Sequence, residues 1–231
     1  MSTCIITGAS RGIGKQIAIK MSQTKNIDNF VIVSRNKKAL DETYELMNKE
    51  KTIKICAVDL ENSEMIKEII KEIAEEFGTI DYLVNCAGYA EPQSLLETSV
   101  ENWNKTFAVN VTSIFCIIKE VVKIMKKTGG KILNIASTAG SSARPGWLAY
   151  AASKAAIISM SQTISAELKE YGIKTYCISP GRCATELRRV LAPNEDPSTI
   201  MQPEDVASVV RNLLSDMETC MDGQDIIVRQ Q

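Results

Sequence analysis

Hydrophobic and polar positions follow two alternating patterns along this chain. Short runs that are apolar at nearly every position alternate with longer segments in which apolar residues recur every three to four positions. The first pattern predicts strands buried on both faces, and the second predicts amphipathic helices. The clearest helix is expected over residues 63–77. Its apolar stripe consists of Met65, Ile66, Ile69, Ile70 and Ile73.

These patterns predict one α/β architecture from end to end. Strands are expected at 3–7, 30–34, 53–58, 80–85, 131–136, 173–178 and 225–229. Helices are expected at 12–22, 38–48, 63–77, 100–126, 148–170 and 203–216. Because helices separate buried strands, the sheet should be parallel and covered on both faces. No Ser/Gly-rich linker or repeat divides the chain, so we predict a single doubly wound domain over residues 1–231, with a sheet of about seven strands.

Composition excludes several kinds of partner. The net charge is −1 with acids and bases interspersed, which does not suit nucleic-acid binding. No apolar run approaches the roughly 20 residues that a membrane span requires. Met1 leads directly into a strand-like run without a signal-peptide pattern. We therefore expect a cytoplasmic protein with neither nucleic acid nor membrane as a partner.

The seven cysteines are scattered, and no two form a Cys-x-x-Cys pair. This distribution is typical of free thiols in a reducing compartment and not of disulfides. The chain also has no histidine, so a zinc site would need distant thiols to converge. We expect no metal site.

A Tyr-Ala-Ala-Ser-Lys segment carries the first candidate chemistry. Tyr150 and Lys154 are four residues apart in a predicted helix, so they share one face. A free phenol has a pKa of about 10, and an ammonium one turn away should lower it. Without histidine, an activated tyrosine is the natural proton carrier. Alone, such a pair is more often a surface feature, so its meaning depends on the rest of the chain.

A glycine-rich segment follows the first predicted strand. Gly8, Gly12 and Gly14 lie between that strand and the helix that follows. A dinucleotide pyrophosphate can approach the backbone there and meet the helix N-terminus. A tight turn would explain the glycines structurally, but the strand–turn–helix context favours nucleotide binding.

The end of the second strand indicates which dinucleotide. An NAD site usually has a carboxylate there for the ribose 2′-hydroxyl, whereas this chain has Ser34 and Arg35, followed by Lys37 and Lys38, with Arg11 in the glycine-rich segment. Guanidinium groups suit a 2′-phosphate. The alternative is a set of solvated surface charges. We favour NADP(H) over NAD(H).

Together these motifs resemble the short-chain dehydrogenase/reductase family over essentially the whole chain. The matching positions in chain order are Thr7–Gly14, Asp59-Leu60, Asn85-Cys86-Ala87-Gly88, Asn110, Ser137, Tyr150 and Lys154, and Pro180-Gly181 with Thr185. Cys86 replaces the second Asn of the family's Asn-Asn-Ala-Gly. The resemblance implies a Rossmann-type fold and hydride transfer between nicotinamide and a carbonyl or secondary alcohol.

The resemblance also implies the site residues. Tyr150 would exchange a proton with the carbonyl oxygen, and Ser137 would polarise that oxygen. Lys154 would lower the pKa of Tyr150 and bind the nicotinamide ribose, and Asn110 would hold a water linking Lys154 to solvent. The implied cofactor contacts are Gly8, Ser10, Arg11, Gly12, Ile13, Gly14, Ser34, Arg35, Asp59, Leu60, Asn85, Ala87, Gly88, Tyr150, Lys154, Pro180, Gly181 and Thr185.

Loops choose the substrate, and here they contain four arginines. These are Arg144, Arg182, Arg188 and Arg189, the last three in the expected substrate loop at about residues 182–202. They suit an anionic substrate, with a solvated charged lid as the equal alternative. The loop is polar and offers little apolar surface for a steroid or a long acyl chain.

Three functional hypotheses follow. Overall resemblance favours a 3-oxoacyl-thioester reductase of the acyl-carrier-protein type, in which the arginines serve the carrier. The rival enzyme is a reductase of a phosphorylated or acidic sugar or polyol precursor. A non-catalytic NADP(H)-binding sensor or scaffold is the third, against which the intact Ser137, Tyr150 and Lys154 argue.

We also expect a homo-oligomer, because the resemblance implies that helix 100–126 and the Tyr150 helix form dimer faces. The chain lacks the family's usual continuation after Val228, which leaves homodimer and homotetramer both open.

Overall fold

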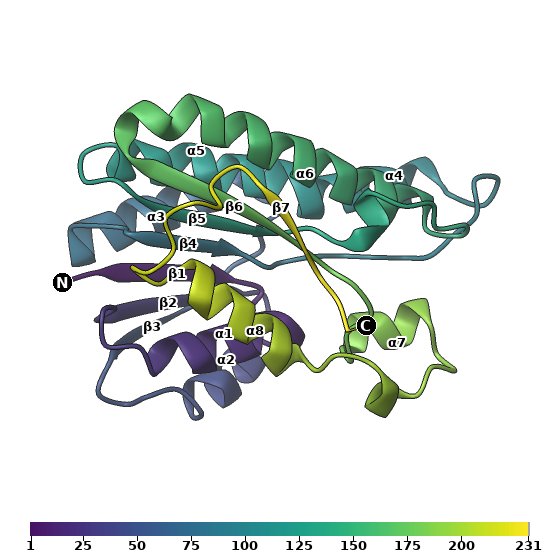
Figure 1. The fold of residues 1–231 in the computed structure, drawn as a ribbon, viewed down its shortest axis with the longest axis horizontal. Coiled ribbons are helices and arrows are strands. Elements are labelled where there is room, and N and C mark those ends of the chain that lie inside the picture. The colour runs from purple at the N-terminus through teal and green to yellow at the C-terminus, as the bar shows by residue number, and fades with distance from the viewer. Residues whose placement is uncertain (231) are drawn as a thin grey trace.

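A seven-stranded parallel sheet forms the centre of the molecule (Figure 1). The structure is a computed structural model that describes residues 1–230. The strands are β1 (Thr3–Thr7), β2 (Asn29–Ser34), β3 (Thr52–Ala57), β4 (Tyr82–Asn85), β5 (Gly130–Ile135), β6 (Ile173–Pro180) and β7 (Asp225–Val228). Their order is β3-β2-β1-β4-β5-β6-β7, which confirms the predicted doubly wound α/β fold.

The order of the strands places a crevice at one edge of the sheet. From β1 the chain adds β2 and β3 on one side, then returns to add β4 on the other side of β1. The connections that leave the carboxyl ends of β1 and β4 therefore diverge. Such a switch point is where open α/β sheets bind their ligands.

Helices cover both faces of the sheet. They are α1 (Gly12–Ser22), α2 (Lys37–Tyr44), α3 (Ser63–Phe77), α4 (Val100–Phe107), α5 (Ser113–Met125), α6 (Leu148–Leu168), α7 (Glu186–Leu191) and α8 (Pro203–Leu213). In Figure 1, α1, α2 and α8 lie on one face, and α3 to α6 lie on the other. No helix within residues 1–230 is both long and apolar enough to cross a membrane.

Alternation of side chains along each strand supplies two separate apolar cores. In β1, Cys4 and Ile6 pack toward α1 and α8, whereas Ile5 packs toward α3 and α5. All five residues of β1 are buried. Successive side chains of a strand point to opposite faces, so a run that is apolar throughout is needed to fill both cores.

One predicted helix was wrong in its interior. The segment expected as a continuous helix over 100–126 consists of α4, a π-helical turn at Ala108–Thr112 and then α5. An apolar stripe at helical spacing does not reveal one wider turn. Within this turn the buried Asn110 side chain is bonded to groups outside the helix, which a sequence pattern does not show.

The predicted substrate loop is more ordered than expected. It contains α7 and a short 3₁₀ helix at Pro197–Thr199. Thr185 caps α7, because its hydroxyl accepts a hydrogen bond from the backbone N–H of Arg188 at 3.1 Å. The other elements begin and end within a few residues of their predicted bounds. The largest difference is in α2, which ends at Tyr44 and is therefore shorter than the helix predicted over residues 38–48.

Candidate active site

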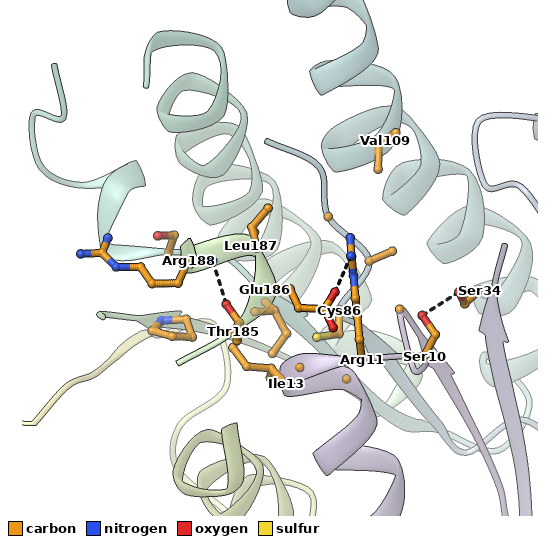
Figure 2. Close-up of a pocket in the computed structure, with 18 of the residues that line it drawn as sticks. Ser10, Arg11, Ile13, Ser34, Cys86, Val109, Thr185, Glu186, Leu187 and Arg188 are labelled. Carbon is orange, nitrogen blue, oxygen red and sulfur yellow. Dashed lines mark hydrogen bonds and ion pairs between the residues drawn. The ribbon is translucent and has the colours of Figure 1, made fainter. Parts of the chain in front are cut away.

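A single long cavity crosses the carboxyl ends of the strands at the switch point (Figure 2). It begins beside the glycine-rich segment and ends beneath α7. Most of the predicted site residues line it: Gly8, Ser10, Arg11, Gly12, Ile13, Gly14, Ser34, Arg35, Asp59, Leu60, Ala87, Gly88, Ser137, Tyr150, Lys154, Pro180, Gly181, Thr185 and Arg188. Residues far apart in the sequence therefore meet in one place.

The glycine-rich segment is packed too closely for side chains. Gly8 has a φ of +68°, and a Cβ there would lie 2.7 Å from the Ala87 nitrogen. A Cβ on Gly14 would lie 2.2 Å from the Gly8 carbonyl oxygen. No side chain caps the N-terminus of α1, and its first turn has no acidic residue. Free N–H groups at a helix N-terminus favour an anion, so this segment fits a dinucleotide pyrophosphate.

A buried threonine joins the two loops that face each other across the switch point. The Thr7 hydroxyl oxygen accepts hydrogen bonds from the backbone N–H groups of Cys86 (3.1 Å) and Ala87 (3.3 Å). Thr7 ends β1, while Cys86 and Ala87 follow β4. One side chain thereby fixes the turn that leads to Gly88 in the cavity.

Polar and basic groups gather where a 2′-phosphate was expected. The Ser34 hydroxyl donates to the Ser10 hydroxyl at 2.9 Å (Figure 2). Arg35 and Arg11 also line the cavity. Each is paired at the surface, Arg35 with Glu61 at 3.6 Å and Arg11 with Glu186 at 2.7 Å. No carboxylate occupies the position after β2, so these residues fit a phosphorylated ribose. Lys37 and Lys38 do not line the cavity.

The tyrosine and lysine lie on the same face of α6, as predicted, but their electrostatics differ from the expectation. Burial raises the pKa of Tyr150 to about 12, while the Ser137 hydroxyl and the Arg188 charge lower it. Burial also lowers the pKa of Lys154 to about 8. The Lys154 ammonium donates to the carbonyl oxygen of Ile135 at 2.8 Å, and its Nζ is 5.7 Å from the Tyr150 ring centroid.

These values correct one expectation. In this structure Lys154 does not bring the pKa of Tyr150 toward neutrality, because the cost of burying a phenolate is larger than the nearby favourable charges offset. Tyr150 is consequently a protonated phenol at neutral pH. That is the form which can donate a proton to a carbonyl oxygen.

Asn110 lies on the π-helical turn and is fully buried. Its Oδ1 accepts from the Tyr89 N–H at 2.8 Å, and its Nδ2 donates to the Tyr89 carbonyl and the Ser153 hydroxyl, both at 2.9 Å. A Cβ on Gly88 would lie 3.8 Å from Asn110 Oδ1 and 3.9 Å from Lys154 Nζ. Asn110 is thus near Lys154, but its amide is engaged by protein groups and it does not line the cavity.

Asn85, expected to contact the cofactor, lies elsewhere. It is fully buried at the end of β4, and its Nδ2 donates to Asn134 Oδ1 on β5 at 2.8 Å. It does not line the cavity. Asn85 and Asn134 lie opposite each other on neighbouring parallel strands, and their amides bind each other and not a ligand in the cavity.

Only one of the four predicted substrate arginines reaches the cavity. Arg188 lines it, whereas Arg144, Arg182 and Arg189 do not and are exposed. Glu195 binds Arg188 and Arg182 together. A carboxylate inside the loop therefore offsets part of the charge that suggested an anionic substrate.

Sequence reasoning missed the apolar part of the cavity wall. Trp147 lies edge-on to Tyr150 with ring centroids 6.1 Å apart, and Leu187 and Leu191 contribute from α7. Val109, Cys86 and Cys183 also line it. The expectation of little apolar surface in this loop was therefore wrong, because Leu187 and Leu191 line the cavity. Their spacing of four is the sequence signal that could have indicated an apolar helical face.

A doubly wound sheet with a phosphate-binding loop and a buried Tyr-Lys pair at its switch point has the architecture of a dinucleotide-dependent oxidoreductase. The family model described as short chain dehydrogenase matches residues 2–196. The chain belongs to this family and is an oxidoreductase.

Individual relatives show which members of the family this chain resembles. The chain is 33% identical over 222 residues to a 3-oxoacyl-[acyl-carrier-protein] reductase of Synechocystis, covering 92% of this chain and 88% of that protein. It is 31% identical to the 3-oxoacyl-[acyl-carrier-protein] reductase FabG of Vibrio cholerae, with coverage of 97% and 94%. Among solved structures, ElxO with NADP bound has a TM-score of 0.88 at 28% identity, covering 98% of this chain and 96% of that one.

Proposed function

We propose that this protein is an NADP(H)-dependent reductase of 3-oxoacyl thioesters, with Tyr150 as the proton donor. The observation that carries the proposal is the shared cavity. The Ser10, Ser34 and Arg35 cluster lines one end of it, and Tyr150, Ser137 and Lys154 line the other. The likeness to 3-oxoacyl-[acyl-carrier-protein] reductases supports the substrate class, and the likeness to ElxO supports the cofactor.

Residues of this chain would hold the cofactor along the cavity. The N-terminus of α1 with Gly8 and Gly12 would receive the pyrophosphate, and Arg11 and Arg35 the 2′-phosphate. Asp59 and Leu60 would lie beside the adenine. Lys154 would lie against the nicotinamide ribose, and Pro180, Gly181 and Thr185 against the nicotinamide. When bound, the nicotinamide supplies or accepts the hydride.

The chain itself supplies the proton chemistry. The Tyr150 phenol donates its proton to the substrate carbonyl oxygen as charge develops there. The Ser137 hydroxyl donates a hydrogen bond to the same oxygen, and a preorganised donor in a buried site stabilises the developing charge. The Lys154 ammonium would lie beside the phenolate that Tyr150 leaves behind, with its Nζ 5.7 Å from the ring centroid. Asn110 holds the Tyr89 backbone through two hydrogen bonds and so fixes the chain next to Gly88, which lies near Lys154.

The decisive experiment is NADPH oxidation by the purified protein with an acetoacetyl thioester and with ketose phosphates, side by side. We expect turnover of the thioester, abolished in Tyr150→Phe while NADPH binding, measured by fluorescence titration, is retained. Turnover of the ketose phosphates alone would overturn the thioester assignment in favour of a phosphorylated sugar or polyol substrate. Unchanged cellular function of Tyr150→Phe would indicate a sensor or scaffold.

We also propose a homo-oligomer that buries the face formed by α4, α5 and α6 (Figure 1). Large apolar side chains are exposed on these helices, including Val100, Trp103, Phe115 and Leu148. Exposed apolar side chains on neighbouring helices suit burial against a second subunit. Light scattering should give a mass of two or four chains, and the mass of one chain would contradict the proposal.

A further inference from the structure

Arg188 forms part of the wall next to the proposed proton donor. Its guanidinium carbon lies 5.5 Å from the Trp147 ring centroid, and that ring is edge-on to Tyr150. The Arg188 side chain is only 20% exposed. In Figure 2 it leaves α7 on the side opposite Arg11. Arg188 thus belongs to the substrate end of the cavity.

The Arg188 guanidinium has hydrogen-bond donors to spare. Its Nε donates to Glu195 Oε2 at 2.6 Å, and its Nη2 to Glu195 Oε1 at 2.8 Å. A guanidinium carries five N–H groups, and within residues 1–230 no other acceptor binds this one. Three N–H groups therefore remain. Nη1, which carries two of them, is not among the buried unpartnered atoms within residues 1–230, so these donors are open to a ligand from the cavity side.

Glu195 determines what kind of acceptor these donors suit. It contacts the guanidinium through both oxygens, and Arg188 is the main cause of its lowered pKa, so Glu195 is ionised at neutral pH. Arg182 also reaches Glu195 at 3.3 Å, but it is 64% exposed and its charge is screened by solvent. The Arg188–Glu195 pair therefore offers the remaining N–H groups of Arg188 as donors, while the Glu195 carboxylate compensates most of the positive charge of the guanidinium. Such donors favour an uncharged carbonyl oxygen over a free carboxylate or phosphate.

We infer that Arg188 is a substrate-recognition residue that binds the thioester carbonyl oxygen of a 3-oxoacyl substrate, while Tyr150 and Ser137 bind the oxygen being reduced. This inference rests on the proposed function. A 3-oxoacyl thioester has a second carbonyl two carbons from the reacting one, and a simple ketone has none. The Arg188–Glu195 pair therefore selects for 1,3-dicarbonyl substrates.

The first test compares two substrates in matched variants. Arg188→Met should lower kcat/KM for acetoacetyl-N-acetylcysteamine about 10- to 100-fold more than it lowers kcat/KM for 2-pentanone, as expected for loss of a hydrogen bond from a charged group. Arg189→Met removes the neighbouring exposed charge and should change neither substrate by more than threefold. An equal loss on both substrates in Arg188→Met, with NADPH affinity and melting temperature unchanged, would overturn the inference.

The second test measures binding without turnover. Thioester binding to the protein–NADP⁺ complex can be followed by tryptophan fluorescence, since Trp147 lies beside the site. Arg188→Met should weaken binding about 10-fold or more; equal affinity would overturn the inference. If the thioester binds in an Arg188-dependent way but is not reduced, the proposed function fails and the recognition role stands. If it does not bind the unaltered protein, both fail.

Glu195 provides a third readout, of opposite sign. Glu195→Gln removes the compensating charge and leaves Arg188 with uncompensated positive charge. The affinity for acetoacetate relative to the neutral thioester should rise several-fold. An unchanged ratio would show that Glu195 does not set the charge preference and would overturn that part of the inference.

Discussion

Lys154 is bound to the end of β5 and not to the tyrosine one turn before it. Its Nζ donates to the Ile135 carbonyl oxygen at 2.8 Å. The strand end therefore sets the position of the ammonium, and burial around it lowers its pKa to about 8. The charge that would stabilise a Tyr150 phenolate is present below that pH and fades above it.

This arrangement predicts an unusual pH dependence of stability. Between pH 8 and pH 10 the folded protein loses the Lys154 proton, whereas the unfolded chain, with an ordinary lysine pKa, keeps it. The unfolded state then binds more protons, so the free energy of unfolding rises with pH. Relative to Lys154→Met, the unaltered protein should gain about 2 kcal/mol over this range. Urea unfolding at both pH values measures it, and a constant difference would contradict the pKa shift.

The Thr7 hydroxyl predicts a pair of variants with different outcomes. Thr7→Val leaves the Cys86 and Ala87 N–H groups without their acceptor, which should cost about 1–3 kcal/mol of unfolding free energy and weaken NADPH binding. Thr7→Ser keeps the hydroxyl and should retain most of both. Urea unfolding and fluorescence titration provide the measurements. Equal behaviour of the two variants would show that the methyl group, not the hydroxyl, matters here.

Arg35 should decide the choice between the two dinucleotides. Arg35→Ala removes a guanidinium from the Ser10 and Ser34 cluster, and kcat/KM for NADPH should fall about 10-fold or more while that for NADH stays within twofold. Lys37→Ala is the matched control, because Lys37 is paired with Asp41 and lies outside the cavity. A parallel loss with both cofactors would place Arg35 outside the phosphate site.

Glu186 should compete with the cofactor for Arg11. The two side chains are 2.7 Å apart and both 59% exposed, so their pairing contributes at most about 1 kcal/mol. Glu186→Gln should tighten NADPH binding by up to about fivefold at low salt, with less effect at high salt and none on NADH. In an Arg11→Gln background the same change should have no effect. Tighter NADPH binding in that background would show that Glu186 acts on the cofactor directly.

Local patterns determined most of the fold. The inner strands β1, β2 and β4 are buried along their length, and helices such as α3 and α8 have one apolar stripe, so period and length identify a parallel sheet between two helical layers. The glycine-rich segment could also be recognised from the sequence. The structure gives the physical reason for one of its glycines, because a Cβ on Gly14 would lie 2.2 Å from the Gly8 carbonyl oxygen. The spacing of Tyr150 and Lys154 on one helix also follows from helix geometry.

Tertiary structure decided which polar groups meet. The side chains of Asn85 and Asn134 bind each other across two strands, so the amide of Asn85 does not line the cavity as a cofactor ligand was expected to do. The Lys154 ammonium donates to a carbonyl oxygen on β5, and the Glu195 carboxylate accepts hydrogen bonds from Arg188. The sequence presents all four loop arginines alike, yet only Arg188 packs over Trp147. Such pairings join residues that are distant along the chain, and they depend on burial and distance, which no local period encodes.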